Sequence, residues 1–157
     1  MAQHELKEGD PAPGIHAEDD QGKTFDLDSL RGKNVVLYFY PKADTPGCTK
    51  ESCEFRDTTE RFAKNDTVIV GVSPDKAAAQ SKFKAKFDLP FTLLADTDHK
   101  VAETYGVWKE KSMYGKKYMG IERTTFLIGA DGKIHKIFHK VKPEGHAEQV
   151  YGALKTM

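Results

Sequence analysis

The sequence predicts an α/β fold in which helices flank a mixed central β-sheet. Two continuous apolar runs, 35–40 and 67–72, are rich in β-branched and aromatic residues and are typical of strands covered on both faces. Each run is followed by a stretch of helical period, and this alternation implies parallel strands joined by helical crossovers. A later Asp-Gly turn between two further apolar runs predicts a β-hairpin, which adds antiparallel strands to the sheet.

An N-terminal extension precedes the first core strand. Residues 7–14 are rich in Pro and Gly and predict an irregular leader, and residues 20–23 predict a turn between two short extended pieces. Residues 27–32 predict a helical turn or a loop. The first core strand then covers 35–40, and a helix is expected over 46–64.

The alternation continues through the rest of the chain. After the strand at 67–72, Ser73 is the expected N-cap of a helix that has Pro74 at its first position and runs to about Phe87. Residues 106–122 show no clear period and are expected to form a long surface loop. The other expected elements are a strand at 91–95, a helix at 98–105 that Gly106 ends, hairpin strands at 124–128 and 133–139, and a closing helix at 144–156.

Length and composition are those of one domain of ordinary size. We expect residues 1–157 to form a single domain, because a chain of 157 residues can bury a sizeable core. Lys and Arg together number 24, as do Asp and Glu, so no nucleic acid and no membrane is expected as the main partner. The first seven residues lack an apolar leader and no apolar stretch is long enough to span a bilayer, so the expected location is cytoplasmic.

The chain has only two cysteines, Cys48 and Cys53. Because cytoplasmic thiols are kept reduced, such cysteines are more often catalytic or simply buried than joined in a structural disulfide. They are too few for a zinc site with four thiolates, and no metal site is expected. His135 and His139 would share one face of a strand, but no Cys or carboxylate cluster accompanies them, so we expect both at the surface.

Cys48 follows the first core strand at the start of the first long helix. With Thr45 as N-cap and Pro46 as the first helical residue, Cys48 is the third, where unpaired N–H groups and the helix dipole favour an anionic thiolate. Gly47 leaves space beside the sulfur, and Pro41 fixes the preceding backbone and helps to exclude water. The Thr45 hydroxyl can bond the sulfur or the group that the sulfur attacks. The alternative is an inert buried thiol, but the Thr-Pro-Gly-Cys context favours a reactive one.

Cys53 cannot form a bond with Cys48 while the helix between them is intact. Five residues of an ideal helix place the two Cα atoms about 8.7 Å apart and about 140° round the axis. A disulfide usually needs Cα atoms closer than about 7 Å. Either the helix start unwinds when the two sulfurs join, or Cys53 is unrelated to Cys48; the spacing alone leaves both alternatives open.

A mixed sheet with helices on both faces and a thiol after the first core strand is a thioredoxin-like architecture. Within it, Pro41-x-x-x-Thr45-x-x-Cys48 matches the active-site signature of the peroxiredoxins. The neighbouring Cys53 and the segment 106–126 resemble the bacterioferritin comigratory protein, or peroxiredoxin Q, subfamily. The resemblance extends from about residue 7 to the C-terminus.

The resemblance implies a role for each candidate site residue. By it Cys48 is the peroxidatic cysteine, Cys53 the resolving cysteine and Arg123 the active-site arginine, while Glu51 matches a supporting polar position. An arginine near Cys48 would stabilise the thiolate and orient a peroxide oxygen, because it is always charged and carries five donors. From position alone, Arg123 could equally form a surface salt bridge with a neighbour such as Glu122, which would be worth little.

The resemblance also implies a thiol peroxidase that serves in antioxidant defence. The expected cycle reduces hydrogen peroxide or an organic hydroperoxide through a Cys48 sulfenic acid, forms an intramolecular Cys48–Cys53 disulfide and ends with reduction by thioredoxin or a similar dithiol. It needs no metal, haem or flavin, and no dimer, so a monomer is expected. The basic residues of the expected loop predict a solvated surface or a docking surface for the reductant; they are Lys109, Lys111, Lys116 and Lys117.

Three other functions are compatible with the same fold. A thioredoxin-like disulfide reductase is disfavoured because the chain lacks a Cys-x-x-Cys pair and has no proline between Phe91 and Val141. A copper-binding chaperone would use two cysteines and a histidine, usually with a closer cysteine spacing than Cys48 and Cys53 have. The third alternative is a non-catalytic domain that carries a buried thiol.

Overall fold

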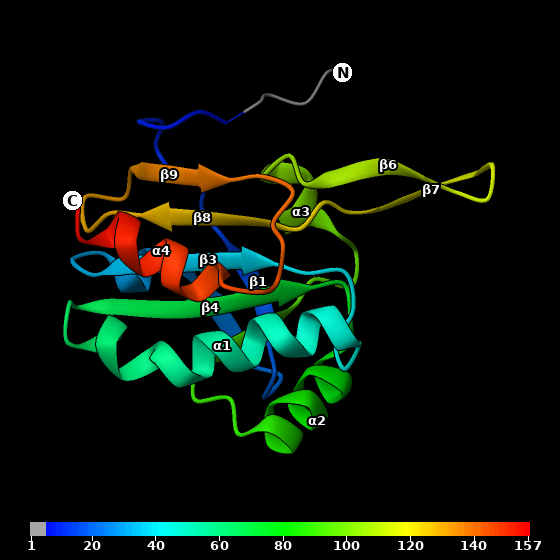
Figure 1. Ribbon diagram of the computed structural model, residues 1–157, viewed down its shortest axis with the longest axis horizontal. Helices are drawn as coiled ribbons and strands as arrows, with labels where there is room; N and C mark the ends of the chain where they lie inside the picture. The colour runs from blue at the N-terminus through cyan, green and yellow to red at the C-terminus, as the bar shows by residue number, and fades with distance from the viewer. Residues whose placement is uncertain (1–5) are drawn as a thin grey trace.

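The computed structural model describes residues 6–157, so the first residues, on which the expectation of a missing leader rests, lie outside the described part. A seven-stranded sheet with the order β2-β1-β5-β4-β3-β8-β9 forms the centre (Figure 1). β3, β4 and β5 are parallel, and the other pairings in this sheet are antiparallel. The strands are β1 His16–Asp19, β2 Thr24–Asp26, β3 Asn34–Phe39, β4 Thr67–Ser73, β5 Thr92–Ala95, β8 Thr124–Ile128 and β9 Ile134–Phe138.

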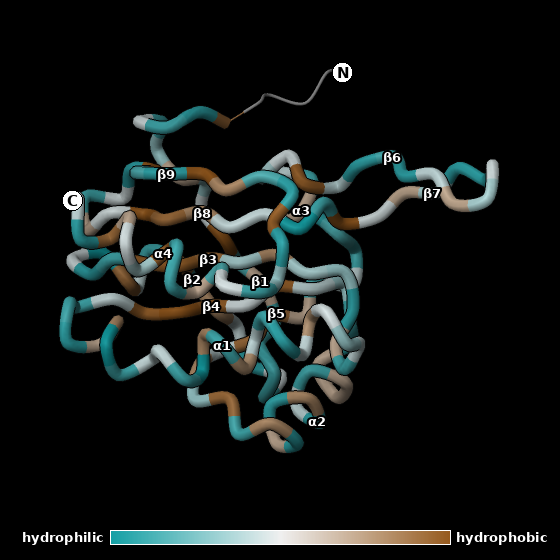
Figure 2. Tube along the Cα trace, in the orientation of Figure 1, coloured by the Kyte–Doolittle hydropathy of each residue, from teal (hydrophilic) through white to brown (hydrophobic). Residues whose placement is uncertain are grey.

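Helices cover both faces of the sheet, which is the predicted mixed α/β, thioredoxin-like arrangement. Alternate residues of β3 point to opposite faces, so Val36 and Tyr38 pack with the helices of one face while Val35 and Leu37 pack on the other. Because both sides are buried, β3 and β4 consist mostly of apolar residues, which appear as brown stretches in Figure 2. One face carries α1 Pro46–Ala63, α2 Ala77–Phe87 and α4 His146–Leu154, and the other carries α3 Lys100–Thr104 and the 3-10 turn η1 Leu27–Leu30.

Most predicted elements are confirmed. The core strands and α1 begin and end within one residue of their predicted positions. α4 is shorter than predicted by two residues at each end, and α3 by two residues at its start and one at its end. The turn at 20–23 joins β1 to β2, as expected. Among residues 6–157, no helix has both the length and the apolar character needed to cross a membrane.

The predicted start of α2 is wrong. Ser73 is the last residue of β4, and the helix begins only at Ala77. The reason is that Ser73 pairs with Ala95 of β5 and its carbonyl oxygen accepts the Asp96 N–H across 2.9 Å, so it cannot accept the first hydrogen bond of a helix. The Ser73 hydroxyl donates to Asp75 Oδ2 across 2.6 Å. The same carboxylate oxygen accepts a 2.7 Å hydrogen bond from the backbone N–H of Ala43, so it ties the end of β4 to the segment before α1.

The predicted long loop at 106–122 is also wrong. β6 Trp108–Met113 and β7 Lys116–Ile121 form a separate antiparallel hairpin around Tyr114 and Gly115. Both turn residues have positive φ, as two-residue hairpin turns of type I′ require. The sequence conceals this hairpin because polar residues lie on both of its faces, so no apolar alternation marks the strands.

Candidate active site

Cys48 lies in the first turn of α1, as the sequence predicts. Thr45 is the N-cap in an extended conformation, with φ −103° and ψ 156°, and Pro46 is the first helical residue. The Cys48 side chain is buried, with 1% of its surface exposed. The helix start therefore presents its free N–H groups in the turn that carries the sulfur, in a site largely closed to water.

Arg123 connects the thiol to a buried carboxylate. Its Nη2 donates to Cys48 Sγ across 3.2 Å, and its Nη1 donates to Glu51 Oε1 across 2.7 Å. Arg123 comes just before β8, which pairs with β3, the strand that leads into the Cys48 segment. Sheet pairing thus brings together three of the predicted site residues, and Arg123 is not the surface ion pair that its position alone allows.

Glu51 is an unusual carboxylate in its burial and its hydrogen bonding. Only 1% of the residue is exposed, and its Oε2 atom has no hydrogen-bond partner among the described residues. Burial raises the pKa of Glu51 to about 7, although the Arg123 guanidinium opposes this rise. The Glu51 carboxyl group, which is hydrogen-bonded to the same arginine as the Cys48 sulfur, therefore changes its charge near neutral pH.

Thr45 and Pro41 lie in the segment that joins β3 to α1. The Thr45 hydroxyl donates to the carbonyl oxygen of Lys42 across 2.8 Å, so it holds the loop before α1 and does not contact the sulfur. Pro41 is partly buried where β3 ends. Both residues belong to the segment between β3 and α1 that leads to Cys48.

Two further residues that the sequence reasoning missed hold α1 against the sheet. The buried hydroxyl groups of Tyr38 and Ser52 are hydrogen-bonded at 2.8 Å, which fixes the helix one turn beyond Cys48. Their signal in the sequence is the four-residue spacing of Ser52 from Cys48, which places both on the buried helix face.

Cys53 does not line this site. Both cysteines are free thiols, and α1 is continuous from Pro46 to Ala63. This agrees with the helix geometry, which does not allow the two sulfurs to bond while the helix is intact. Cys53 is partly buried, and this burial raises the pKa of its thiol against the opposing effect of Arg56. The two cysteines therefore occupy different environments of one helix.

A cleft of about 420 Å³ opens beside Arg123. Burial and the neighbouring Arg123 charge lower the pKa of Lys111 in this cleft. The sequence does not predict Lys111 in this cleft, because it does not predict the β6–β7 hairpin that carries the residue. The cleft is lined by Lys109, Glu110, Lys111, Glu122, Arg123, Lys140 and Val141.

The two histidines of the predicted strand, His135 and His139, are exposed and make local interactions of their own. His139 approaches Glu122 at 3.6 Å, and His135 contacts Thr156. Within residues 6–157, no three His, Cys, Asp or Glu side chains are grouped so that they could hold a metal ion.

Comparisons with known proteins agree on one family. The AhpC/TSA family matches residues 8–137, which include Cys48, Cys53 and Arg123. The chain is 51% identical over 149 residues to peroxiredoxin Bcp of Bacillus subtilis, covering 95% of each chain. It is 46% identical over 150 residues to peroxiredoxin Bcp of Escherichia coli, covering 96% of each.

Solved structures give the same result. The bacterioferritin comigratory protein of Xanthomonas campestris, described for its alkyl peroxide reduction activity, matches with a TM-score of 0.87 and 39% identity over 90% of each chain. A cysteine-to-serine mutant of PrxQ from Xylella fastidiosa matches with a TM-score of 0.92 and 34% identity, covering 99% of this chain and 98% of that one.

Proposed function

Because this chain belongs to the AhpC/TSA family and is a peroxiredoxin-type thiol peroxidase, we propose that Cys48 is its peroxidatic cysteine and Cys53 its resolving cysteine. The observation that carries the assignment is the 3.2 Å contact between Arg123 Nη2 and Cys48 Sγ at a helix N-terminus. A permanent cation and free N–H groups then face one buried sulfur, which is the environment that a nucleophilic thiolate needs.

The first step forms a sulfenic acid. The Cys48 thiolate attacks one oxygen of the peroxide, the O–O bond breaks, and the other oxygen leaves as hydroxide or alkoxide and takes up a proton. Arg123 and the N–H groups of the first turn stabilise the charge that moves onto the leaving oxygen. Thr45 can contribute its hydroxyl once it turns from the Lys42 carbonyl.

Pro41 and Glu51 shape the place where the peroxide binds. Pro41 closes the end of β3 against water, and Glu51 fixes the guanidinium of Arg123 through Nη1 so that Nη2 points at the sulfur. Both are assigned to substrate binding, Pro41 by exclusion of water and Glu51 through Arg123.

The second step joins the two cysteines. The Cys53 thiol condenses with the Cys48 sulfenic acid, a disulfide forms and one water leaves. The start of α1 must open first, because an intact helix holds the two Cα atoms about 8.7 Å apart. An external dithiol, thioredoxin or a similar protein, then reduces the disulfide by thiol–disulfide exchange.

The substrates are hydrogen peroxide and organic hydroperoxides. The relative from Xanthomonas campestris is described for alkyl peroxide reduction, and the open cleft beside Arg123 offers room for an organic group. The protein acts in the cytoplasm as a monomeric single domain, because its cycle needs reduced thiols and no residue of a second chain.

One experiment tests these roles. The fully reduced protein is treated with stoichiometric hydrogen peroxide, and the mass and free thiols are followed with time. The wild type should lose both thiols rapidly, Cys53→Ser should stop at the sulfenic acid or proceed to the sulfinic acid, and Cys48→Ser should be inert. Peroxide consumption by Cys48→Ser at the wild-type rate would overturn the assignment of Cys48.

A further inference from the structure

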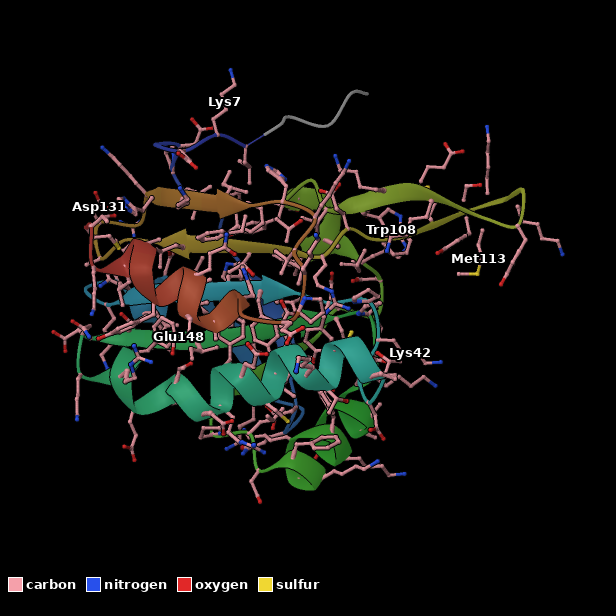
Figure 3. The ribbon with its side chains drawn as sticks, in the orientation of Figure 1. Lys7, Lys42, Trp108, Met113, Asp131 and Glu148 are labelled. Atoms are coloured by element: carbon pink, nitrogen blue, oxygen red, sulfur yellow. The ribbon has the colours of Figure 1, made fainter. Side chains whose placement is uncertain are left out.

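The β6–β7 hairpin projects from the body of the protein (Figure 1). Within the described residues 6–157, its two strands pair only with each other. At its base, Trp108 stacks on His99 with ring centroids 4.0 Å apart, and Ile121, opposite Trp108, is buried. Met113 lies towards the far end of the hairpin from Trp108 (Figure 3). The hairpin is thus anchored at its base and extends its tip into solvent.

The hairpin carries an unusual amount of exposed apolar surface. Five large hydrophobic side chains of residues 6–157 are exposed, and four of them belong to this hairpin, between positions 113 and 119. Single exposed apolar residues are ordinary, whereas a cluster of them marks an interaction surface. The four exposed fractions are 56% for Met113, 98% for Tyr114, 44% for Tyr118 and 48% for Met119.

Tyr114 occupies a position that does not suit an aromatic residue. Its φ is +53°, in the left-handed region where Asn, Asp and Gly are the usual turn residues. The ring gains no burial in return, since 98% of the residue is exposed. A strained position that keeps an exposed aromatic ring points to a role outside the isolated fold.

The apolar side chains lie on both faces of the hairpin. Residues directly opposite in an antiparallel pair share a face, so Tyr118 lies with Lys111 on one side and Met119 with Glu110 on the other. Tyr114 forms the turn between the strands. A globular partner would cover one face only, whereas exposed apolar side chains on both faces suit a medium that surrounds the hairpin.

The charge of the hairpin completes the pattern. Between Trp108 and Ile121 there are four lysines and one acidic residue, Glu110, although the whole chain has a net charge of zero. Lys116 and Lys117 lie beside the turn, opposite Met113 and Ser112, and Lys109 and Lys111 lie nearer to the base. The Lys117 amine also approaches Glu110 at 3.6 Å. Exposed apolar side chains interspersed with lysines, whose long stems let the amine reach lipid phosphates, are complementary to a bilayer whose headgroups are anionic.

We propose that the β6–β7 hairpin docks this protein on anionic lipid surfaces. The side chains of Met113, Tyr114, Tyr118 and Met119 enter the boundary between headgroups and acyl chains, and the lysines bind lipid phosphates. The interaction is peripheral and goes beyond the proposed peroxidase function. It also sets an orientation, since the cleft beside Arg123 is lined by Lys109 and Lys111 of the same hairpin.

The test is co-sedimentation of the reduced, full-length protein with vesicles of phosphatidylcholine, alone or mixed with phosphatidylglycerol. We expect binding to the mixed vesicles only, weakened by added salt. Since each lysine near an anionic surface contributes about fivefold to partitioning, Lys116→Gln with Lys117→Gln should reduce binding about thirtyfold. The matched control changes two exposed lysines outside the hairpin, Lys64→Gln with Lys133→Gln, and should bind like the wild type.

A second variant tests the apolar tip. Tyr114→Asn suits the positive φ of the turn, so it should fold as well as the wild type while losing the ring that enters the lipid. The expected result is weaker vesicle binding with unchanged consumption of hydrogen peroxide.

Three results would overturn the lipid assignment. Wild-type vesicle binding by both hairpin variants is one, and an equal loss of binding in the Lys64 and Lys133 control is another. The third is the absence of vesicle binding together with a concentration-dependent dimer, seen by sedimentation velocity and abolished by the hairpin variants. That result would assign the surface to a second copy of this chain.

Discussion

Arg123 Nη2 donates a hydrogen bond to Cys48 Sγ across 3.2 Å, although 75 positions separate the two residues in the sequence. The other terminal nitrogen, Nη1, binds the buried carboxylate of Glu51. One planar guanidinium thus holds two groups at once, which a single ammonium cannot do with the same geometry. The reactivity of the thiol should therefore depend on Arg123 as a fork and not only as a charge.

Substitution of Arg123 should separate these two contributions. Arg123→Met should slow the reaction of Cys48 with hydrogen peroxide by about a hundredfold or more, as expected when a donor to the developing charge is removed. Arg123→Lys keeps the charge and should slow it by only about tenfold, because one charge-assisted hydrogen bond of about 1.5 kcal/mol is lost. Stopped-flow competition for peroxide measures both rates. Equal rates for the two variants would contradict the role of the fork.

Glu51 should make the stability of the protein depend on pH near neutrality. Burial raises its pKa from an ordinary value of 4.5 to about 7. At a pH between these two values, Glu51 is protonated in the folded state but ionised in the unfolded state. Stability is therefore greatest at the acidic side of this window and falls as the pH rises through it. The loss across the window should be on the order of 3 kcal/mol.

Glu51→Gln provides the control for this pH dependence, because the amide keeps the shape but does not titrate. Urea unfolding of the reduced proteins at pH 5 and pH 8 gives the comparison. The wild type should lose stability relative to Glu51→Gln as the pH rises between these values. If the difference between the two proteins stays constant or changes with the opposite sign, Glu51 does not titrate in this window.

The opening of α1 should limit disulfide formation. The segment before the helix is tied to β4 by the hydrogen bond from the Ala43 N–H to Asp75, and Asp75→Ala removes this tie. Without it, condensation of Cys53 with the sulfenic acid should be faster by about fivefold, the equivalent of one hydrogen bond. The control is Lys86→Gln, which breaks the exposed Lys86–Asp44 ion pair and should change the rate little.

Hydrogen exchange of the oxidised protein checks the same step directly. Amides of residues 46–53 should lose protection when the disulfide forms, while the core strands keep theirs. A bonded Cys48–Cys53 pair within a fully protected helix would show that the required unwinding does not occur.

Gly71 should tolerate no side chain. An added Cβ would lie 2.9 Å from atoms of Leu93 and Tyr38, and the Tyr38 hydroxyl holds Ser52 of α1. Gly71→Ala should therefore destabilise the protein by about 1–3 kcal/mol through overpacking. Gly152→Ala in α4 meets no atom within 4 Å and should stabilise the protein by about 0.5 kcal/mol, since alanine favours helix. Urea unfolding measures both; a Gly71→Ala protein as stable as the wild type would contradict the packing argument.

The secondary-structure elements that the sequence predicts correctly are mainly the buried ones. The core strands and α1 were located within one residue, because continuous apolar runs and the Thr45-Pro46 start are signals contained in the local sequence. The prediction of Ser73 as a helix cap was wrong because its backbone is paired with β5 at the end of β4. The hairpin at 108–121 was not predicted because neither of its faces is continuously buried. Its strands therefore show no alternation of apolar and polar residues in the sequence.

The sequence by itself determined the α/β fold, the position of Cys48 at a helix start and the inability of Cys53 to bond with it in an intact helix. These follow from local periods, capping residues and helix geometry, which act over a few positions. Only the tertiary structure decided that Arg123 contacts Cys48, that Glu51 shares this arginine with its pKa near 7, and that the basic segment forms a projecting hairpin. Those relationships depend on sheet pairing and burial between residues far apart in the chain, and no local pattern encodes them.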